Sequence, residues 1–241
     1  MRARMSSDRR PPFVVRHFGM LAWALGFLAV ACVGTGLYLD SQAAERERWI
    51  GEPGAIDLLP RIDLTRDSIV GTWGLQGGVL ISPEVPEGRL QLRHRVPQEY
   101  DLILLVERRS EEFRSFHLGL PVGGRQVLVT LDGFGPEPRS ALEFLDGKVS
   151  SEPGSVHDEP LFALRETRRV VCSVRRGRLR VAVGATRVID WEGDFGRLGL
   201  PEHWSVPEPG SAFVGTWKSR FAVRQISLVP LPPLPAPSTK K

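Results

Sequence analysis

The chain has 241 residues, of which 41% are hydrophobic and 25% charged, and its formal net charge at pH 7 is +4. Five arginines and one aspartate in the first 16 residues already account for this charge, so the rest of the chain is neutral overall. A neutral globular part has no long-range field for a polyanion, which argues against a nucleic-acid-binding protein. Two cysteines, Cys32 and Cys172, are too few for a disulfide framework or a cysteine-based zinc site.

An uncharged apolar segment follows the basic N-terminus and runs from Phe18 to Leu39. At about 1.5 Å per residue, a helix of this length covers the roughly 30 Å hydrocarbon core of a bilayer. The positive-inside rule keeps the preceding arginines in the cytoplasm. We therefore predict a basic cytoplasmic tail over residues 1–17, one transmembrane helix over 18–39, and a C-terminal part outside the cytoplasmic membrane.

Two other interpretations of this segment stay open. A cleaved signal peptide normally has an apolar region of only about 7 to 15 residues, although SQAA at 41–44 resembles a small-residue cleavage site. Lipid attachment at Cys32 is the other, since LAVAC loosely resembles a lipoprotein box, but Ala29 stands where leucine is usual. We expect an uncleaved anchor.

Polar segments lie on both sides of the central part of the chain. Residues 40–66 contain Pro53 and Pro60 and have no sustained hydrophobic period, so we expect a juxtamembrane spacer. Residues 232–241 end a proline-rich stretch, PLPPLPAPSTKK, and we expect an extended tail there.

Short β-branched segments alternate with glycine, proline and aspartate clusters between residues 67 and 231, and no helical period of ten residues is present. This pattern predicts an all-β domain, a two-sheet jelly-roll sandwich. Glycine turns such as LPVGGRQ at 120–126 indicate hairpins. The predicted strands are 69–75, 79–82, 89–93, 100–108, 113–120, 125–131, 141–145, 170–174, 178–183, 186–190, 212–216 and 221–229.

The order of several motifs is more specific than any one of them. GTWGLQGGVLIS, RLQLRHRVPQEYDLILLVER, LGLPVGGRQVLVTLDG, LRVAVGATRVIDWEGD and SAFVGTWKSRFAVRQISLVPL follow one another from residue 71 to residue 231. This order resembles a concanavalin A-like (LamG-type) jelly-roll domain and is most similar to the bacterial 3-keto-disaccharide hydrolase-like family. The resemblance implies a sandwich fold and, where a ligand of such domains is known, a glycan.

Three carboxylates alternate at Asp190, Glu192 and Asp194, which would place them on one face of a strand. Paired carboxylates of this kind flank the scissile bond in glycosidases. The pattern departs from the glucanase motif, because Arg197 stands where a second glutamate is expected. We interpret these acids as solvated or as loop caps, with a calcium or sugar site and a catalytic pair as alternatives.

The histidines have no metal-ligand spacing, and the chain contains neither a Gly-x-Ser-x-Gly motif nor a phosphate loop. VHDE at 156–159 reads as an exposed loop, with a weak Ca²⁺ site as the alternative. We therefore assign no catalytic residue, metal or cofactor.

The arginine-rich stretch from 169 to 194 is interpreted as the outside of a sheet. If Val170, Cys172 and Val174 pair with the strand at 178–183, one face is apolar and Cys172 is buried, while the arginines point outward. An anionic polysaccharide or lipid headgroup could bind such arginines, but a solvated hairpin is favoured.

These observations favour a membrane-anchored, extracytoplasmic binding module that holds a glycan or a surface protein. The candidate ligand contacts are Trp191, Asp190, Asp194 and Arg125, because sandwich lectins commonly place their sites in such loops. The alternatives are a glycoside-processing enzyme that uses Glu192 with Asp190 or Asp194, and a structural domain without a ligand.

Overall fold

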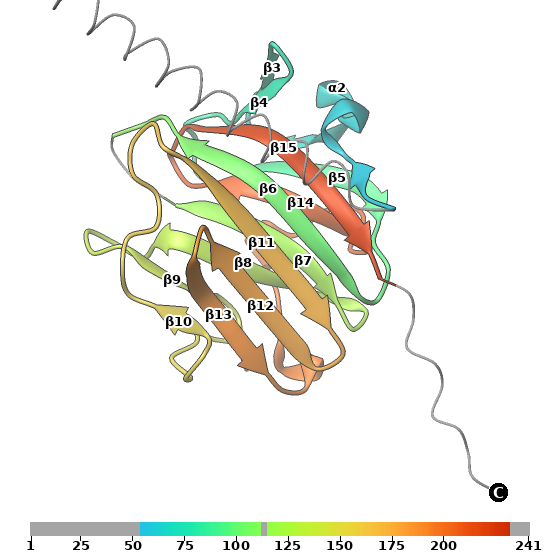
Figure 1. Ribbon diagram of the computed structural model, residues 1–241, viewed down its shortest axis with the longest axis vertical. Coiled ribbons are helices and arrows are strands. Elements are labelled where there is room, and N and C mark those ends of the chain that lie inside the picture. The colour runs from blue at the N-terminus through green and yellow to red at the C-terminus, as the bar shows by residue number, and fades with distance from the viewer. Residues whose placement is uncertain (1–53, 112–114, 232–241) are drawn as a thin grey trace, which may run out of the picture. The chain divides into compact units, whose positions relative to one another are not determined.

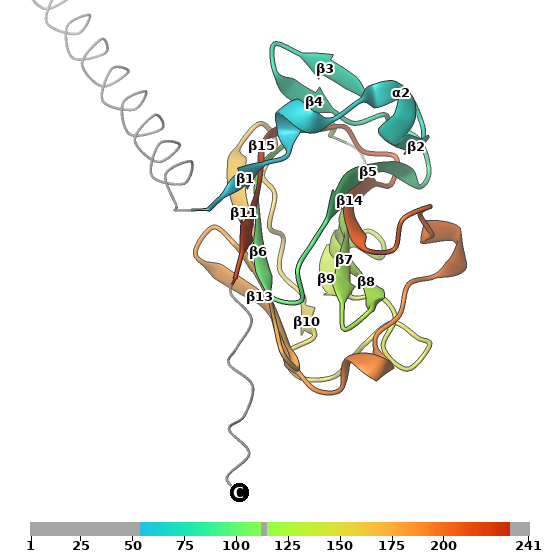
Figure 2. The same cartoon turned by 90° about the vertical axis from the view of Figure 1, so that its right-hand side faces the viewer.

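The computed structural model describes residues 54–111 and 115–231, which form a sandwich of two antiparallel β-sheets (Figure 1). Seen edge-on, β1, β15, β6 and β11 lie in one layer and β5, β14, β7 and β8 in the other (Figure 2). The predicted all-β, two-sheet sandwich is confirmed. Within the described ranges, no helix is long and apolar enough to cross a membrane. The predicted anchor at 18–39 and the tails at 1–17 and 232–241 lie outside these ranges.

The eight-stranded sheet has the order β13-β12-β11-β6-β15-β4-β3, with β1 also paired to β15. Its strands are β1 (Ile56–Asp57), β3 (Gly74–Gln76), β4 (Val79–Ile81), β6 (Tyr100–Arg108), β11 (Thr167–Arg175), β12 (Arg178–Val183), β13 (Thr186–Glu192) and β15 (Phe221–Pro230).

The seven-stranded sheet has the order β10-β9-β8-β7-β14-β5-β2. Its strands are β2 (Ser68–Val70), β5 (Gly88–Arg95), β7 (Phe116–Val122), β8 (Arg125–Gly133), β9 (Arg139–Leu142), β10 (Val156–His157) and β14 (Ser211–Thr216). Short helices lie between strands: η1 (Leu59–Arg61), α2 (Leu64–Asp67), η2 (Phe195–Arg197) and η3 (Glu202–Trp204).

The core lies between the sheets and follows from the period of two along each long strand. In β11, Val170, Cys172 and Val174 are fully buried, and they lie opposite Val183, Val181 and Leu179 of β12. This is the predicted pairing, and the Cys172 thiol is buried and free. Burial raises the pKa of that thiol far above its ordinary value.

The predicted strand at 69–75 is divided between the two sheets. β2 ends at Val70 in the seven-stranded sheet, and β3 begins at Gly74 in the eight-stranded sheet. Gly71 makes the turn with a φ of 79°, and a Cβ there would lie 2.5 Å from Cγ of Pro83. Glycine is therefore required for the chain to cross between sheets. The residue at which we expected β7 to begin, Phe113, lies outside the described ranges.

Part of the segment that we expected as a spacer packs on the sandwich. β1 pairs with β15, with Ile56 opposite Leu228, and Leu58 and Leu59 are buried in the core. Asp63 caps α2 by accepting hydrogen bonds from the N–H groups of Thr65 and Arg66. The ordered sandwich thus includes residues that precede position 67.

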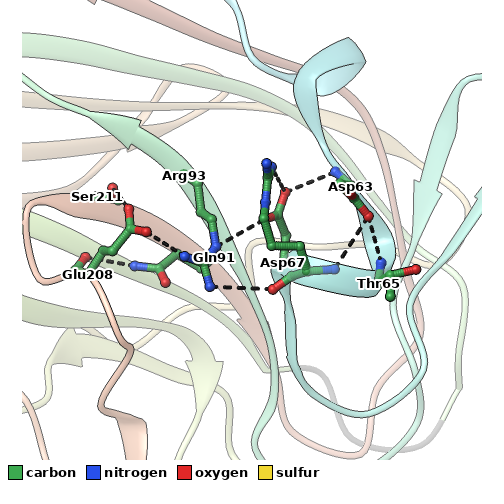
Figure 3. Close-up of polar contacts among 8 residues, drawn as sticks. Asp63, Thr65, Asp67, Gln91, Arg93, Glu208 and Ser211 are labelled. Carbon is green, nitrogen blue, oxygen red and sulfur yellow. Dashed lines mark hydrogen bonds and ion pairs between the residues drawn. The ribbon is translucent and has the colours of Figure 1, made fainter.

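A polar cluster joins α2 to β5 (Figure 3). Asp67 is 1% exposed, yet its carboxylate accepts a hydrogen bond from Arg66 Nε at 2.6 Å and lies 3.1 Å from Arg93 Nε. Burial alone would raise the pKa of Asp67, but the hydrogen bonds from Arg66 and the Asp63 N–H, together with the two guanidinium charges, hold it below its ordinary value. Arg93 also pairs with Glu208, so the cluster connects α2 to the segment before β14.

Candidate functional site

A second hydrophobic cluster covers part of the outer face of the seven-stranded sheet. Trp204 of η3 packs there with Leu128, Val206 and Phe213. Two glycines make room for the rings: a Cβ on Gly119 would lie 1.9 Å from Cε1 of Phe213, and one on Gly215 would lie 2.6 Å from Cζ3 of Trp204. The rings therefore lie directly against the backbone of the sheet.

Next to this cluster, the same outer face is hollowed into a cavity of about 910 Å³. The sheet contributes His117 of β7 and Thr130 of β8, which lie directly opposite each other in register. Glu143, one residue beyond β9, also lines the cavity. The loops contribute aromatic rings, with Trp204 from η3 and Trp217 just after β14. The cavity thus combines rings and hydrogen-bonding groups from five parts of the chain.

The polar groups of the cavity form a hydrogen-bonded chain. Nδ1 of His117 lies 3.0 Å from Oγ1 of Thr130, and the Thr130 hydroxyl donates to Oε2 of Glu143. His117 is only 4% exposed, and its Nε2 has no hydrogen-bond partner among the described residues. Buried polar atoms are normally paired, so this buried nitrogen keeps an unused hydrogen-bonding capacity in a residue that lines the cavity.

Burial also sets the charges in the site. It lowers the pKa of His117 to about 3, so the ring is neutral at pH 7. Burial raises the pKa of Glu143 above its ordinary value, against the opposing effects of the Thr130 hydrogen bond and the nearby His203. The His117 ring lies 4.5 Å from the Trp204 ring, centroid to centroid. The cavity therefore offers a neutral imidazole beside an indole.

Buried Arg89 holds η3 in place on the far side of this ring. Its guanidinium carbon lies 5.6 Å from the Trp204 ring centroid, and its Nη1 donates to the carbonyl of His203. Arg89, Gly215 and His117 lie in one cross-strand row, from β5 through β14 to β7. Trp204 is thus held over the one residue of this row that has no side chain.

Asp132 lines the cavity as well, but its carboxylate has a structural role. It accepts hydrogen bonds from the backbone N–H groups of Leu161 and Phe162, each at 2.9 Å. These bonds attach the segment before β11 to the end of β8. Glu143 is therefore the carboxylate of this cavity that is connected to His117.

The four residues predicted to contact a ligand do not line this cavity. Asp190 lies on the outer face of the other sheet, where Arg178, Arg180 and Arg187 approach it at 2.8, 3.1 and 3.2 Å. Trp191 is 2% exposed, and its ring stacks on Phe195 at 6.2 Å. A ring buried in the core offers no free face on which a sugar could stack.

The other two predicted residues lie elsewhere again. Asp194 caps η2 by accepting the N–H of Gly196 at 2.8 Å, which is the loop-capping alternative weighed for these acids. Arg125 lines a shallower pocket of about 350 Å³ with Leu198 and Ser205. Glu192, the candidate of the enzyme alternative, has a side chain that is 76% exposed and lies 3.8 Å from Arg178.

The VHDE segment is partly a strand. His157 belongs to β10, and Asp158 pairs with Arg139 at 3.1 Å. Over the described ranges, no group of three or more histidine, cysteine, aspartate or glutamate side chains is arranged to hold a metal ion.

One signal in the sequence could have indicated part of the site. If the strands at 113–120 and 125–131 pair across Gly123 and Gly124, His117 falls opposite Thr130 and both point to one face. No local pattern connects them to Glu143 or Trp204, which depend on how a later strand and a distant loop pack.

The sandwich resembles solved structures at low sequence identity. The exoplasmic/lumenal domain of VIP36, in a form bound to Ca²⁺ and Man2, is 13% identical, with coverage of 76% of this chain and 90% of that chain and a TM-score of 0.51. The carbohydrate-binding module CBM66 from Bacillus subtilis is 11% identical, with coverage of 74% and 97% and a TM-score of 0.49. The first likeness shows that the chain shares the β-sandwich fold of that domain. No family model and no curated protein sequence matches the chain.

Proposed function

We propose that this domain binds a glycan in the cavity lined by His117, Trp204 and Trp217. One observation carries the proposal: in a cavity of about 910 Å³, the buried, neutral His117 imidazole packs against the buried Trp204 ring, and the partly exposed Trp217 is the accessible indole of the lining. Ligand sites typically combine apolar and aromatic walls with a few well-placed polar groups. A sugar suits such a site because it presents a C–H face to the partly exposed Trp217 ring and hydroxyl groups to the polar groups of the lining.

The proposal includes attachment to a membrane. An uncharged segment at 18–39 behind a basic tail supports a single-pass anchor with the sandwich outside the cytoplasmic membrane. A module in that position would hold a surface glycan, free or carried by a surface protein, close to the bilayer.

A glycoside-processing enzyme is the second candidate, in line with the resemblance to the 3-keto-disaccharide hydrolase-like family. Glu143 favours it, because burial raises the pKa of this carboxyl in the cavity, and an acid of that kind can protonate a leaving group. Turnover of 3-keto or ordinary disaccharides that is lost in Glu143→Gln and kept in Glu192→Gln would replace the binding proposal with this one.

Glycan-array binding of the full-length protein in detergent micelles tests the proposal. His117→Gln and Trp217→Ala should each reduce the bound signal about 10- to 100-fold, since a lost ligand hydrogen bond or ring contact is worth roughly 1–3 kcal/mol. Arg187→Ala, on the outer face of the opposite sheet, is the matched control and should bind like the wild type. A wild-type protein that binds no glycan, or undiminished binding by both cavity variants, would reject the proposal.

A further inference from the structure

We propose that His117, Thr130 and Glu143 form a proton relay that makes His117 Nε2 the base of the cavity, with Glu143 as the final proton acceptor. The relay would act on a hydroxyl group of the bound ligand. Only this action on a ligand rests on the proposed function. The arrangement of protons within the three residues needs no ligand.

The argument begins with the protons that these groups can hold. The Thr130 hydroxyl has one proton and contacts two groups, Glu143 Oε2 and His117 Nδ1. An ionised carboxylate can only accept, so the hydroxyl proton points to Glu143 and Oγ1 must accept from Nδ1. A neutral imidazole has one N–H, which is then on Nδ1. Nε2, the nitrogen without a partner, therefore carries a lone pair.

A transfer along this chain is balanced at each atom. The ligand O–H bond breaks as Nε2–H forms, the Nδ1–H bond breaks as a new Oγ1–H forms, and the original Oγ1–H bond breaks as Oε2–H forms. The negative charge leaves Glu143 and arrives on the ligand oxygen. In a resting complex the hydroxyl only donates a hydrogen bond to Nε2.

The relay avoids a charge that this site cannot hold. His117 is 4% exposed, and a buried imidazolium without a carboxylate at its own ring would be strongly disfavoured. When the proton moves on through Thr130, the ring changes tautomer and stays neutral. Before the transfer the negative charge is on Glu143, which is only half-buried, and after it Glu143 is protonated and neutral.

The same chain runs in reverse when Glu143 is protonated. Glu143 then donates to Thr130, Thr130 donates to Nδ1, and Nε2 carries the proton and becomes a donor. The other titratable groups that face this part of the cavity are His203 of η3, Asp132 of β8 and Glu111 beyond β6. Asp132 is held by the N–H groups of Leu161 and Phe162, and Glu143 is the carboxyl that accepts from the Thr130 hydroxyl, so Glu143 sets the tautomer.

Histidine-ring NMR of the full-length protein tests the relay without any ligand. The protein is labelled with ¹⁵N on histidine only, held in detergent micelles and titrated from pH 8 to pH 4, and His117→Gln identifies the two signals of this ring. At pH 8, Nδ1 should have the chemical shift of a protonated nitrogen and Nε2 that of an unprotonated one. As Glu143 takes up a proton, the two nitrogens should exchange these shifts while the ring stays neutral.

Three variants make the result specific. Thr130→Val keeps the shape and removes the hydroxyl, so the tautomer should lose its pH dependence, whereas Thr130→Ser should keep it. Glu143→Ala, at a half-buried position, should lock the ring in the Nε2–H form at every pH. An Nε2–H ring in the wild type at pH 8, or an unchanged pH dependence in Thr130→Val or Glu143→Ala, would overturn the relay. A glycan array without binding would leave this result as it is, so the two proposals fail separately.

Discussion

At the scale of single residues, buried His117 makes the stability of the protein depend on pH in the acid range. Its pKa is about 3 in the folded protein against 6.5 in a free side chain, so between these values the unfolded chain binds a proton that the native state does not. The stabilisation is complete above pH 6.5 and is lost as the pH falls, at roughly 1.4 kcal/mol per pH unit.

His117→Gln should remove this pH dependence. The free energy of unfolding of the wild type should fall by about 2 kcal/mol more than that of the variant between pH 7 and pH 5. Urea unfolding at the two pH values measures the difference. Equal losses in both proteins would show that the buried ring titrates with an ordinary pKa.

At the scale of elements, the strands that the sequence predicts well are the long ones. β11 and β12 alternate buried and outward residues over six positions or more, and their pairing follows from that period, whereas β6 is a nearly continuous run of buried residues. β1 and β10 have two residues each, too few to show a period. The crossing at Gly71 was missed for a different reason. Ile69 and Val70 before the glycine and Trp73 and Leu75 after it are all strand-favouring residues, so the segment has the composition of one continuous strand.

The candidate site was largely beyond prediction because it depends on packing between distant elements. Asp190, Trp191 and Asp194 are neighbours in the chain, but strand alternation and the following turn direct them to an outer face, the core and a helix cap. The cavity instead depends on η3 lying against β14. That contact requires a residue without a side chain at position 215, and only the sheet pairing reveals it.

Gly119 offers a direct test of how the aromatic cluster is supported. Its φ is not in the left-handed region, so alanine is tolerated by the backbone, but the new Cβ would overlap the Phe213 ring. Gly119→Ala should therefore lower the free energy of unfolding by about 1–3 kcal/mol, as overpacking does. Gly74→Ala is the matched control, since nothing lies within 4 Å of a Cβ there. Equal free energies of unfolding for the two variants, measured with urea, would contradict this packing.

At the scale of the whole molecule, the proposed anchor predicts one orientation in the membrane. Each arginine carried to the centre of a bilayer on a helix costs roughly 2.5–3.5 kcal/mol on insertion scales, and five precede residue 18. Protease added to spheroplasts of a bacterial host that expresses the full-length chain should digest an epitope placed after Lys241 and spare one at the N-terminus. Protection of the C-terminal epitope would exclude an extracytoplasmic sandwich.

The glycan site itself is located most directly by the indole N–H signals of the full-length protein, labelled with ¹⁵N on tryptophan only. Trp204 and Trp217 line the cavity, while Trp73 and Trp191 are buried in the main core and serve as internal controls. When the tightest-binding glycan of the array is added to saturation, the signals of Trp204 and Trp217 should shift and those of Trp73 and Trp191 should not. A shift confined to Trp191, or no shift at Trp204 and Trp217, would contradict the assignment of this cavity as the binding site.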